Sequence, residues 1–339
     1  MGRGEYSRAL AIARGAATRW PGAAIHFILS REAPYAGQAP FPATWLASSP
    51  TFHSAAVIKL IETWAPDVVI FDNAGRTAQL QAVKRSGAGL VYVSARPRQR
   101  RKAFRLRWMG LIDEHWIAYP EFVAGRLSFL ERLLLKLLRR PTLRYLDVMM
   151  ESGGAAAESI LAREGLVAGG YVLVVPGGGT GHPGAAGAVD QFLGAARGLA
   201  ALGMHIVFVG REQGECTASS LLRMRGALPQ SELAALMRNA RLIVANGGST
   251  LLQSIACGKP CVAAPIARDQ HERIRRCAKA GVAVAAPLHA PAILRAVTAL
   301  LDDAARFEGL AARSIALGLS DGVDVAVRAL NAMLLTKRS

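Results

Sequence analysis

The stretch ALPQSELAALMRNARLIVANGGSTLLQSIACGKPCVAAPIARDQ, residues 227–270, predicts the architecture of this chain. It contains two uninterrupted apolar runs, RLIVANG (241–247) and PCVAAP (260–265), separated by a helical pattern. Unbroken apolar runs are typical of strands buried on both faces. Strands that alternate with helices are typical of a doubly wound parallel sheet, so this stretch predicts an α/β fold.

The same alternation continues in both directions along the chain. Further strands are expected at 24–30, 66–72, 89–95, 171–176 and 205–210, and helices at 5–20, 77–87, 189–203, 231–240, 250–258, 271–281 and 323–335. The segment 151–170 is rich in glycine and alanine and is interpreted as a linker. We therefore expect two Rossmann-like domains, residues 1–150 and 170–339, joined by a linker at 151–169.

The first five residues, Met1-Gly2-Arg3-Gly4-Glu5, are typical of the glycine turn that follows a first strand. Either the start of the protein lies upstream, or the N-terminal sheet lacks its usual first strand. We therefore expect that strand to be missing from the N-terminal domain of this sequence.

The amino-acid composition excludes several classes of protein and favours an anionic partner. Lysine and arginine total 41 against 24 acidic residues, a net charge of +17, which favours an anionic partner such as a nucleotide, a membrane surface or nucleic acid. The apolar fraction of 52% excludes a disordered chain. Four cysteines without a C-x-x-C pattern argue against a disulfide scaffold or a metal cluster, and no signal peptide is visible. A cytoplasmic location is expected.

A glycine-rich turn, PGGGTGHPG at 176–184, lies between an expected strand and an expected helix. Such turns bring backbone N–H groups close to a phosphate at the positive end of a helix. The residues expected to bind phosphate here are Gly177, Gly178, Gly179, Thr180 and Gly181. Two alternatives remain: a tight strand–helix turn without a ligand, and an NAD(P) site of an oxidoreductase, because the turn also matches G-x-G-x-x-G.

A second turn of this kind, NGGSTLLQSIACGKP, spans residues 246–260. The residues expected to face a ligand are Gly247, Gly248, Ser249, Thr250 and Gln253. The alternative is that the two hydroxyl side chains only cap the helix. Two phosphate-type turns at one edge of a sheet suit a ligand with a diphosphate.

A third element, PIARDQHER, spans residues 265–273. Asp269 and Gln270 follow a strand, and a carboxylate beside an amide can hold sugar hydroxyls. The alternative is an ordinary exposed loop.

Residues 227–270 resemble the donor-binding domain of GT-B glycosyltransferases of the MurG and UDP-glucuronosyltransferase kind. The resemblance implies two Rossmann-like domains facing a cleft. It implies that Gly247 and Thr250 contact the diphosphate of an NDP-sugar, most simply a UDP-sugar. Gln253 stands where a ribose-binding glutamate is usual, and Asp269 and Gln270 match the pair that holds the sugar. The loop at Leu228–Leu233 lies beside the nucleobase on this resemblance.

The first half resembles the acceptor domain of these enzymes in outline, through GRGEYSRALAIAR at 2–14. On this resemblance Gly2, Gly4 and Arg8 lie on the acceptor side. Glu5 stands near the position of a catalytic histidine and is a candidate base, with an ordinary helix-start carboxylate as the alternative.

Asp72, in the FDNAG segment, is the second candidate base, and Asn73 beside it is expected to orient the acceptor. The opening segment also resembles that of PseG-type sugar-nucleotide hydrolases.

The resemblance implies a metal-independent enzyme without a cofactor that transfers a hexosyl or N-acetylhexosaminyl group to a hydroxyl acceptor. Lipid-linked and cell-envelope glycans are the candidate acceptors. Hydrolysis of the sugar nucleotide and a non-catalytic nucleotide-sugar-binding scaffold remain the alternatives.

Two basic segments suit docking on the inner face of an anionic cytoplasmic membrane. The segment 96–107 carries seven lysines and arginines in twelve residues, and 127–140 is a leucine-rich helical pattern that ends in Arg139 and Arg140. The resemblance implies such a surface on the acceptor domain for lipid-linked acceptors. The alternatives are core packing for the helix and a solvated loop for the arginine run. Nucleic-acid binding is not favoured, because no stacking platform accompanies the charges.

Overall fold

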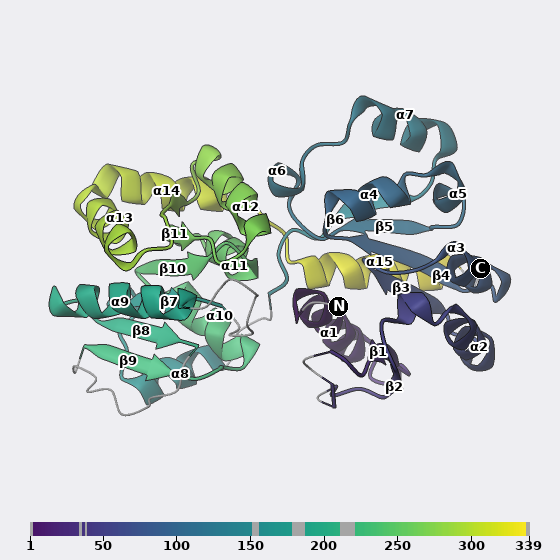
Figure 1. The fold of residues 1–339 in the computed structure, drawn as a ribbon, viewed down its shortest axis with the longest axis horizontal. Coiled ribbons are helices and arrows are strands. Elements are labelled where there is room, and N and C mark those ends of the chain that lie inside the picture. Colours follow the sequence, from purple (N-terminus) through teal and green to yellow (C-terminus); the bar gives the residue numbers. More distant parts are fainter. Residues whose placement is uncertain are drawn as a thin grey trace. The chain divides into compact units, whose positions relative to one another are not determined.

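The structure is a computed structural model that describes residues 3–33, 36–37, 39–150, 156–177, 187–210 and 221–336. It divides the chain into two compact units, which we call unit 1 (Met1–Met149 with Ser320–Ser339) and unit 2 (Met150–Leu319). Each unit combines parallel strands with helices, which confirms the predicted α/β class (Figure 1).

Unit 2 is built on one parallel sheet of six strands. Its strands are β7 (Val172–Val175), β8 (Ile206–Val209), β9 (Leu222–Arg225), β10 (Leu242–Asn246), β11 (Cys261–Ala264) and β12 (Val284–Ala285). They are ordered β12-β11-β10-β7-β8-β9, so the first strand lies between the second and the fourth. This 3-2-1-4-5-6 order is that of dinucleotide-binding sheets, and the direction of winding reverses between β7 and β10.

Seven helices of unit 2 lie within the described ranges. They are α8 (Ala156–Glu164), α9 (Ala188–Ala201), α10 (Gln230–Asn239), α11 (Ser249–Ala256), α12 (Arg268–Lys279), α13 (Ala290–Asp302) and α14 (Ala304–Ala316). Every residue of β7 and β10 is buried, as their unbroken apolar sequences predict. Phe192 of α9 and Ile293 of α13 pack in one core with Val174 and Val244 of these two strands.

Unit 1 contains two separate parallel sheets. One pairs β1 (Phe27–Ser30) with β2 (Ala43–Leu46), and the other has the order β3 (Val68–Asp72), β4 (Gly89–Ser94), β5 (Glu114–Ile117) and β6 (Thr142–Tyr145). Among the described residues, α1 (Arg3–Arg19) is the first element, and no strand joins β1 to β3. In unit 2, β7 is the first strand and lies between the second strand, β8, and the fourth strand, β10. The equivalent position in unit 1, between β1 and β3, holds no strand within the described residues.

Helix packing joins the two sheets of unit 1. The other helices of this unit are α2 (Ser54–Trp64), α3 (Thr77–Arg85), α4 (Pro97–Ala103), α5 (Leu106–Met109), α6 (Glu121–Ala124), α7 (Phe129–Leu138) and α15 (Gly322–Thr336), with a 3-10 turn at Pro50–Phe52. Ile61 of α2 packs in a single core with Ile28 of β1 and Phe71 of β3, so the apolar face of α2 spans both sheets. Within the described ranges, no helix combines the length and apolar character that crossing a bilayer requires.

The C-terminal helix belongs to unit 1, which differs from the predicted boundary at 170–339. Ala326, Ala329 and Leu330 of α15 pack in one core with Ile12 of α1 and Trp116 of β5. The sequence places this helix after unit 2, but it lies beside the β3–β6 sheet of unit 1 (Figure 1). Its apolar side chains pack with those of β4 and β5 in that sheet.

The expected linker at 151–169 also contains structure of unit 2. Residues 156–164 form α8, whose Ile160 is buried, and Glu164 at its end pairs with Arg225 of β9. Helix α8 packs on α10, so part of the segment that was interpreted as a linker, because it is rich in glycine and alanine, is a helix of unit 2.

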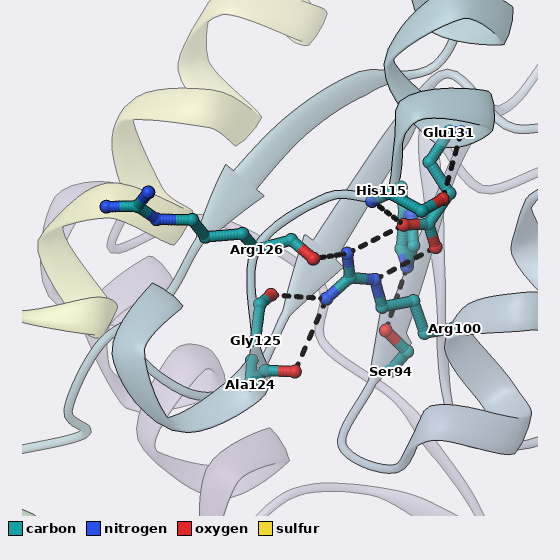
Figure 2. Close-up of polar contacts among 8 residues, drawn as sticks. Ser94, Arg100, His115, Ala124, Gly125, Arg126 and Glu131 are labelled. Atoms are coloured by element: carbon teal, nitrogen blue, oxygen red, sulfur yellow. Dashed lines mark hydrogen bonds and ion pairs between the residues drawn. The ribbon is translucent and has the colours of Figure 1, made fainter. Parts of the chain in front are cut away.

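A buried histidine lies in the core of unit 1. His115 on β5 has no exposed surface, and its Nε2 lies 2.8 Å from Oγ of Ser94 on β4 (Figure 2). Burial, with a smaller contribution from the Arg100 guanidinium, lowers the pKa of His115 to about 3. The imidazole is therefore neutral in the folded protein at physiological pH.

We expect His115 to make the stability of the protein depend on pH. The pKa of histidine in an unfolded chain is about 6.5, so below that pH the unfolded state binds a proton that the folded state excludes. This group should therefore lower the free energy of unfolding by about 1.4 kcal/mol for each pH unit between about pH 6.5 and about pH 3. Urea unfolding of wild type and His115→Gln at several pH values checks this. Parallel pH profiles for the two proteins would contradict it.

Candidate functional site

The C-terminal edge of the unit 2 sheet brings together the turns that the sequence singles out. β11, β10 and β7 are neighbouring parallel strands, so the turns that follow them lie at one edge. These turns begin at Pro176, Gly247 and Pro265. The edge between β7 and β10 is the switch point of the sheet, where ligands of open α/β sheets bind.

Asn246, the last residue of β10, braces the switch point. Its Nδ2 donates to the carbonyl oxygen of Pro176 at 2.8 Å, and its Oδ1 accepts from the N–H of Gly248 at 2.7 Å. The side chain is buried and satisfies one backbone group on each turn. The sequence prediction did not include Asn246, although a polar residue that ends an apolar run before two glycines was a signal for it.

Gly177 fits against this amide. Its φ is +104°, a region that favours glycine, and a Cβ at this position would overlap Nδ2 of Asn246. The glycine at 177 is therefore required both by the backbone conformation and by the close approach of Asn246. Gly178, Gly179, Thr180 and Gly181 lie outside the described residues.

The glycine amides of the second turn are used differently from the prediction. The N–H of Gly247 donates to Oε1 of Gln270 at 3.1 Å, and that of Gly248 donates to Asn246. Gly247 was expected to contact a diphosphate, and Gly248 was expected to face the ligand. In this structure both amides hold the turn in place instead, because they donate to the buried side-chain oxygens of Gln270 and Asn246.

The start of α11 is the part of this turn that remains suited to an anion. Gly248 is its N-cap residue and no side chain caps the helix, while Ser249 and Thr250 lie inside its first turn. The predicted alternative, a hydroxyl side chain as the N-cap, is therefore wrong. The first-turn N–H groups and the positive end of the helix dipole point toward the switch point. Thr250 and Gln253 are buried at this end of the unit.

Asp269 and Gln270 do not act as a side-by-side pair. They lie in the first turn of α12, not in a loop, and adjacent helical residues point about 100° apart. Asp269 is 72% exposed at its side chain, whereas Gln270 is buried and its Oε1 also accepts from the N–H of Ile266 at 2.9 Å. Gln270 therefore connects the turns after β10 and β11.

Arg273 adds a positive charge at this edge, which the sequence prediction missed. One guanidinium nitrogen donates to the carbonyl of Gly247, and another lies 3.4 Å from Asp269. Its position one turn after Asp269 on α12 was the available signal. Leu228 is half-buried in the segment after β9; the expected loop from there to Leu233 ends at Pro229, because α10 begins at Gln230.

Unit 1 has its own polar cluster at the C-terminal end of β3. The Arg8 guanidinium on α1 donates to both oxygens of Asp72, at 2.9 and 2.6 Å, and both side chains are buried. Burial raises the pKa of the Asp72 carboxyl; Arg8 opposes that rise and Glu5 adds to it. Arg8, which was expected on the acceptor side, thus binds both oxygens of Asp72.

Glu5 and Asn73 form the second half of this cluster. Asn73 Nδ2 donates to Oε1 of Glu5 at 2.9 Å, and Asn73 Oδ1 accepts from the N–H of Ala95 at 2.7 Å. Asn73 has a φ of +53°, which turns the chain sharply at the end of β3. The expected glycine turn is already helical at Gly4, where a Cβ would meet nothing within 4 Å, and Gly2 lies outside the described residues.

Solved structures of low sequence identity match nearly the whole chain. The spinosyn forosaminyltransferase SpnP is 14% identical, with 96% of this chain and 94% of that chain covered and a TM-score of 0.64. LpCGTa in complex with UDP is 13% identical, with 98% and 97% covered and a TM-score of 0.63. The chain has the GT-B fold.

A third match agrees with this assignment of the GT-B fold. A UGT transferase from Siraitia grosvenorii in complex with UDP is 12% identical, with 99% of this chain and 98% of that chain covered and a TM-score of 0.60. Comparisons with protein-family models and with curated proteins found no match. At such identities the likeness concerns the fold, and the activity has to be argued from the residues themselves.

We expect Gly177→Ala to destabilise the protein more than Gly203→Ala does. Both glycines have a positive φ, but only at Gly177 would the new methyl group overlap Asn246; at Gly203 it meets nothing within 4 Å. The crowding should cost about 1–3 kcal/mol beyond the strain common to both variants. Denaturant unfolding measures the difference. Equal losses would show that Asn246 does not constrain this turn.

Proposed function

We propose that this chain is a glycosyltransferase that transfers a sugar from a UDP-sugar to a hydroxyl acceptor. The observation that carries the proposal is the pair of turns braced by Asn246 beside the uncapped start of α11, at the switch point of unit 2. The GT-B fold supports it, since two of the three matching structures reported above hold UDP. Donor binding is assigned to unit 2 and acceptor activation to unit 1.

In unit 2, the start of α11 would bind the diphosphate. Its first-turn N–H groups and the Thr250 hydroxyl are donors for phosphate oxygens, and the Gln253 amide is of the type that binds ribose hydroxyls. Leu228 is assigned to the nucleobase and Asp269, the exposed member of its pair, to the sugar.

Transfer breaks the bond between the anomeric carbon and the diphosphate oxygen, so negative charge develops on the leaving UDP. The helix dipole of α11 and the Arg273 guanidinium are positive groups at that edge, and we assign them the stabilisation of this charge without a metal ion. Undiminished activity in EDTA is the corresponding expectation.

In unit 1, Glu5 is the better candidate for the base. Both oxygens of Asp72 are bound by Arg8, which makes Asp72 a group that positions Arg8 and the start of α1. Glu5 is half-buried, and Asn73 orients it through Oε1. Glu5 would take the proton of the acceptor hydroxyl as that oxygen bonds to the anomeric carbon. Among hydroxyl acceptors we favour a lipid-linked or cell-envelope glycan, with a hexose or N-acetylhexosamine as the transferred sugar.

Thr250→Val should weaken UDP binding by about tenfold, because it removes one hydroxyl donor to a phosphate and conserves the shape of the side chain. Isothermal titration calorimetry with UDP measures the effect. Thr298→Val is the matched control, since the Thr298 hydroxyl bonds within its own helix at Leu294. Unchanged affinity in Thr250→Val would rule out the assignment of α11 to the diphosphate.

Glu5→Gln should lower turnover by about 10²–10⁴-fold and leave UDP affinity unchanged, because an amide cannot accept the proton. UDP release is followed with and without an acceptor, and Glu62→Gln, an exposed change on α2, is the control. Full turnover in Glu5→Gln would exclude Glu5 as the base. UDP release in wild type that needs no acceptor would indicate hydrolysis in place of transfer.

A further inference from the structure

Helix α7 exposes a large apolar surface on unit 1. Phe129 is 75% exposed, Leu137 is 74% exposed and Leu133 is 47% exposed, and these three residues recur every fourth position. Leu130, 61% exposed, lies on the same side of the helix. No residue of α7 is buried, so core packing, the alternative that the sequence left open for this helix, is wrong.

Polar contacts fix α7 to unit 1 from its other side. The Arg100 guanidinium on α4 is buried and donates to both oxygens of Glu131, at 3.1 and 2.8 Å (Figure 2). The same guanidinium binds the carbonyls of Gly125 at 2.6 Å and of Arg126 at 3.0 Å. Ser128 and Glu131 also form a capping box that fixes the first turn.

This arrangement leaves Phe129, Leu130, Leu133 and Leu137 on the side of α7 that faces away from unit 1. Glu131 precedes Leu133 by two residues and therefore points about 200° away from it around the helix. The side that holds α7 in place thus combines the Glu131 contacts with the half-buried Leu134 and Leu135, and the side that faces outward is apolar. Water-soluble surfaces normally show the reverse pattern, so the outward leucines indicate an apolar partner.

Positively charged side chains lie on α7 itself and on the α4–α5 segment, which contacts α7 through Arg100. Exposed arginine and lysine side chains on or next to α7 and on α4 and α5 are Arg98, Arg101, Arg105, Arg107, Arg126, Arg132, Lys136, Arg139 and Arg140. Glu131 is the single acidic residue in 126–140, and it is paired with Arg100. The Arg100–Glu131 contact places α4 against the first turn of α7. The expected solvated loop at 96–107 is instead helical in α4 and α5, where Leu106 is also exposed.

We propose that α7 docks unit 1 on an anionic lipid bilayer. The helix would lie in the plane of the interface, with Phe129, Leu130, Leu133 and Leu137 at the headgroup–acyl boundary and the cations of α7 and the α4–α5 segment at the lipid phosphates. Neither the apolar face nor the cations would suffice alone, because a short apolar face partitions weakly into the bilayer and salt screens the charges. The proposal does not depend on nucleotide binding in unit 2.

Flotation of the chain of residues 1–339 with lipid vesicles tests the proposal. The chain should bind vesicles with about one quarter phosphatidylglycerol and not vesicles of phosphatidylcholine alone, and raising NaCl to about 0.5 M should weaken the binding. Leu133→Glu/Leu137→Glu should lower the bound fraction at least about tenfold. Arg132→Gln/Lys136→Gln should lower it less and reduce its salt dependence.

The matched control is Val167→Glu/Leu202→Glu, which removes two exposed apolar side chains of unit 2 and changes the charge equally. Circular dichroism and UDP calorimetry show whether each variant stays folded, and they also keep this test separate from that of the proposed function. Absence of binding to anionic vesicles would overturn the proposal, as would equal loss in the control. A wild-type dimer that Leu133→Glu/Leu137→Glu converts to monomer, with vesicle binding unchanged, would assign the surface to a second copy of the chain.

Discussion

The amide of Asn246 is the contact on which the candidate site in unit 2 depends. It donates to the carbonyl of Pro176 after β7 and accepts from the backbone N–H of Gly248 after β10. The winding of the sheet reverses between these two strands. A sheet of this order separates the two turns at its switch point, and hydrogen bonding between strands stops before it reaches them. Asn246 continues that connection through a side chain. The positions of Gly177 and Gly248, and through them the start of α11, follow from this one buried group.

Unit 1 uses the same principle with charged groups. α1 is tied to the end of β3 by Arg8 and Asp72, and Glu5 is tied to the residue that follows by Asn73. In both units a polar side chain at the carboxyl end of a strand fixes the start of a helix. One difference is that Asn246 is neutral, whereas the Arg8–Asp72 pair carries opposite charges out of water, a cost that the two parallel hydrogen bonds offset.

Much of the fold could be predicted because it is encoded locally. β7, β10 and β11 have unbroken apolar sequences bounded by glycine or proline, and the structure places strands there. The partner of α15 could not be predicted, because its apolar face fits any core of suitable shape and only tertiary packing selects unit 1. The sequence also could not predict where each side chain points. Asp269 and Gln270 are adjacent, yet Asp269 is exposed and Gln270 is buried beneath a turn. The roles of Asn246 and Arg273 depend on contacts between residues far apart in the chain.

The return of α15 to unit 1 has a consequence for how the protein is made. Ile12 and Trp116 are synthesised before unit 2, but the helix that covers them is synthesised after it. All of unit 2 is completed in the interval. Nascent unit 1 therefore carries an uncovered apolar patch while unit 2 already has every residue it needs to fold, so the second unit of the chain is the first that can mature.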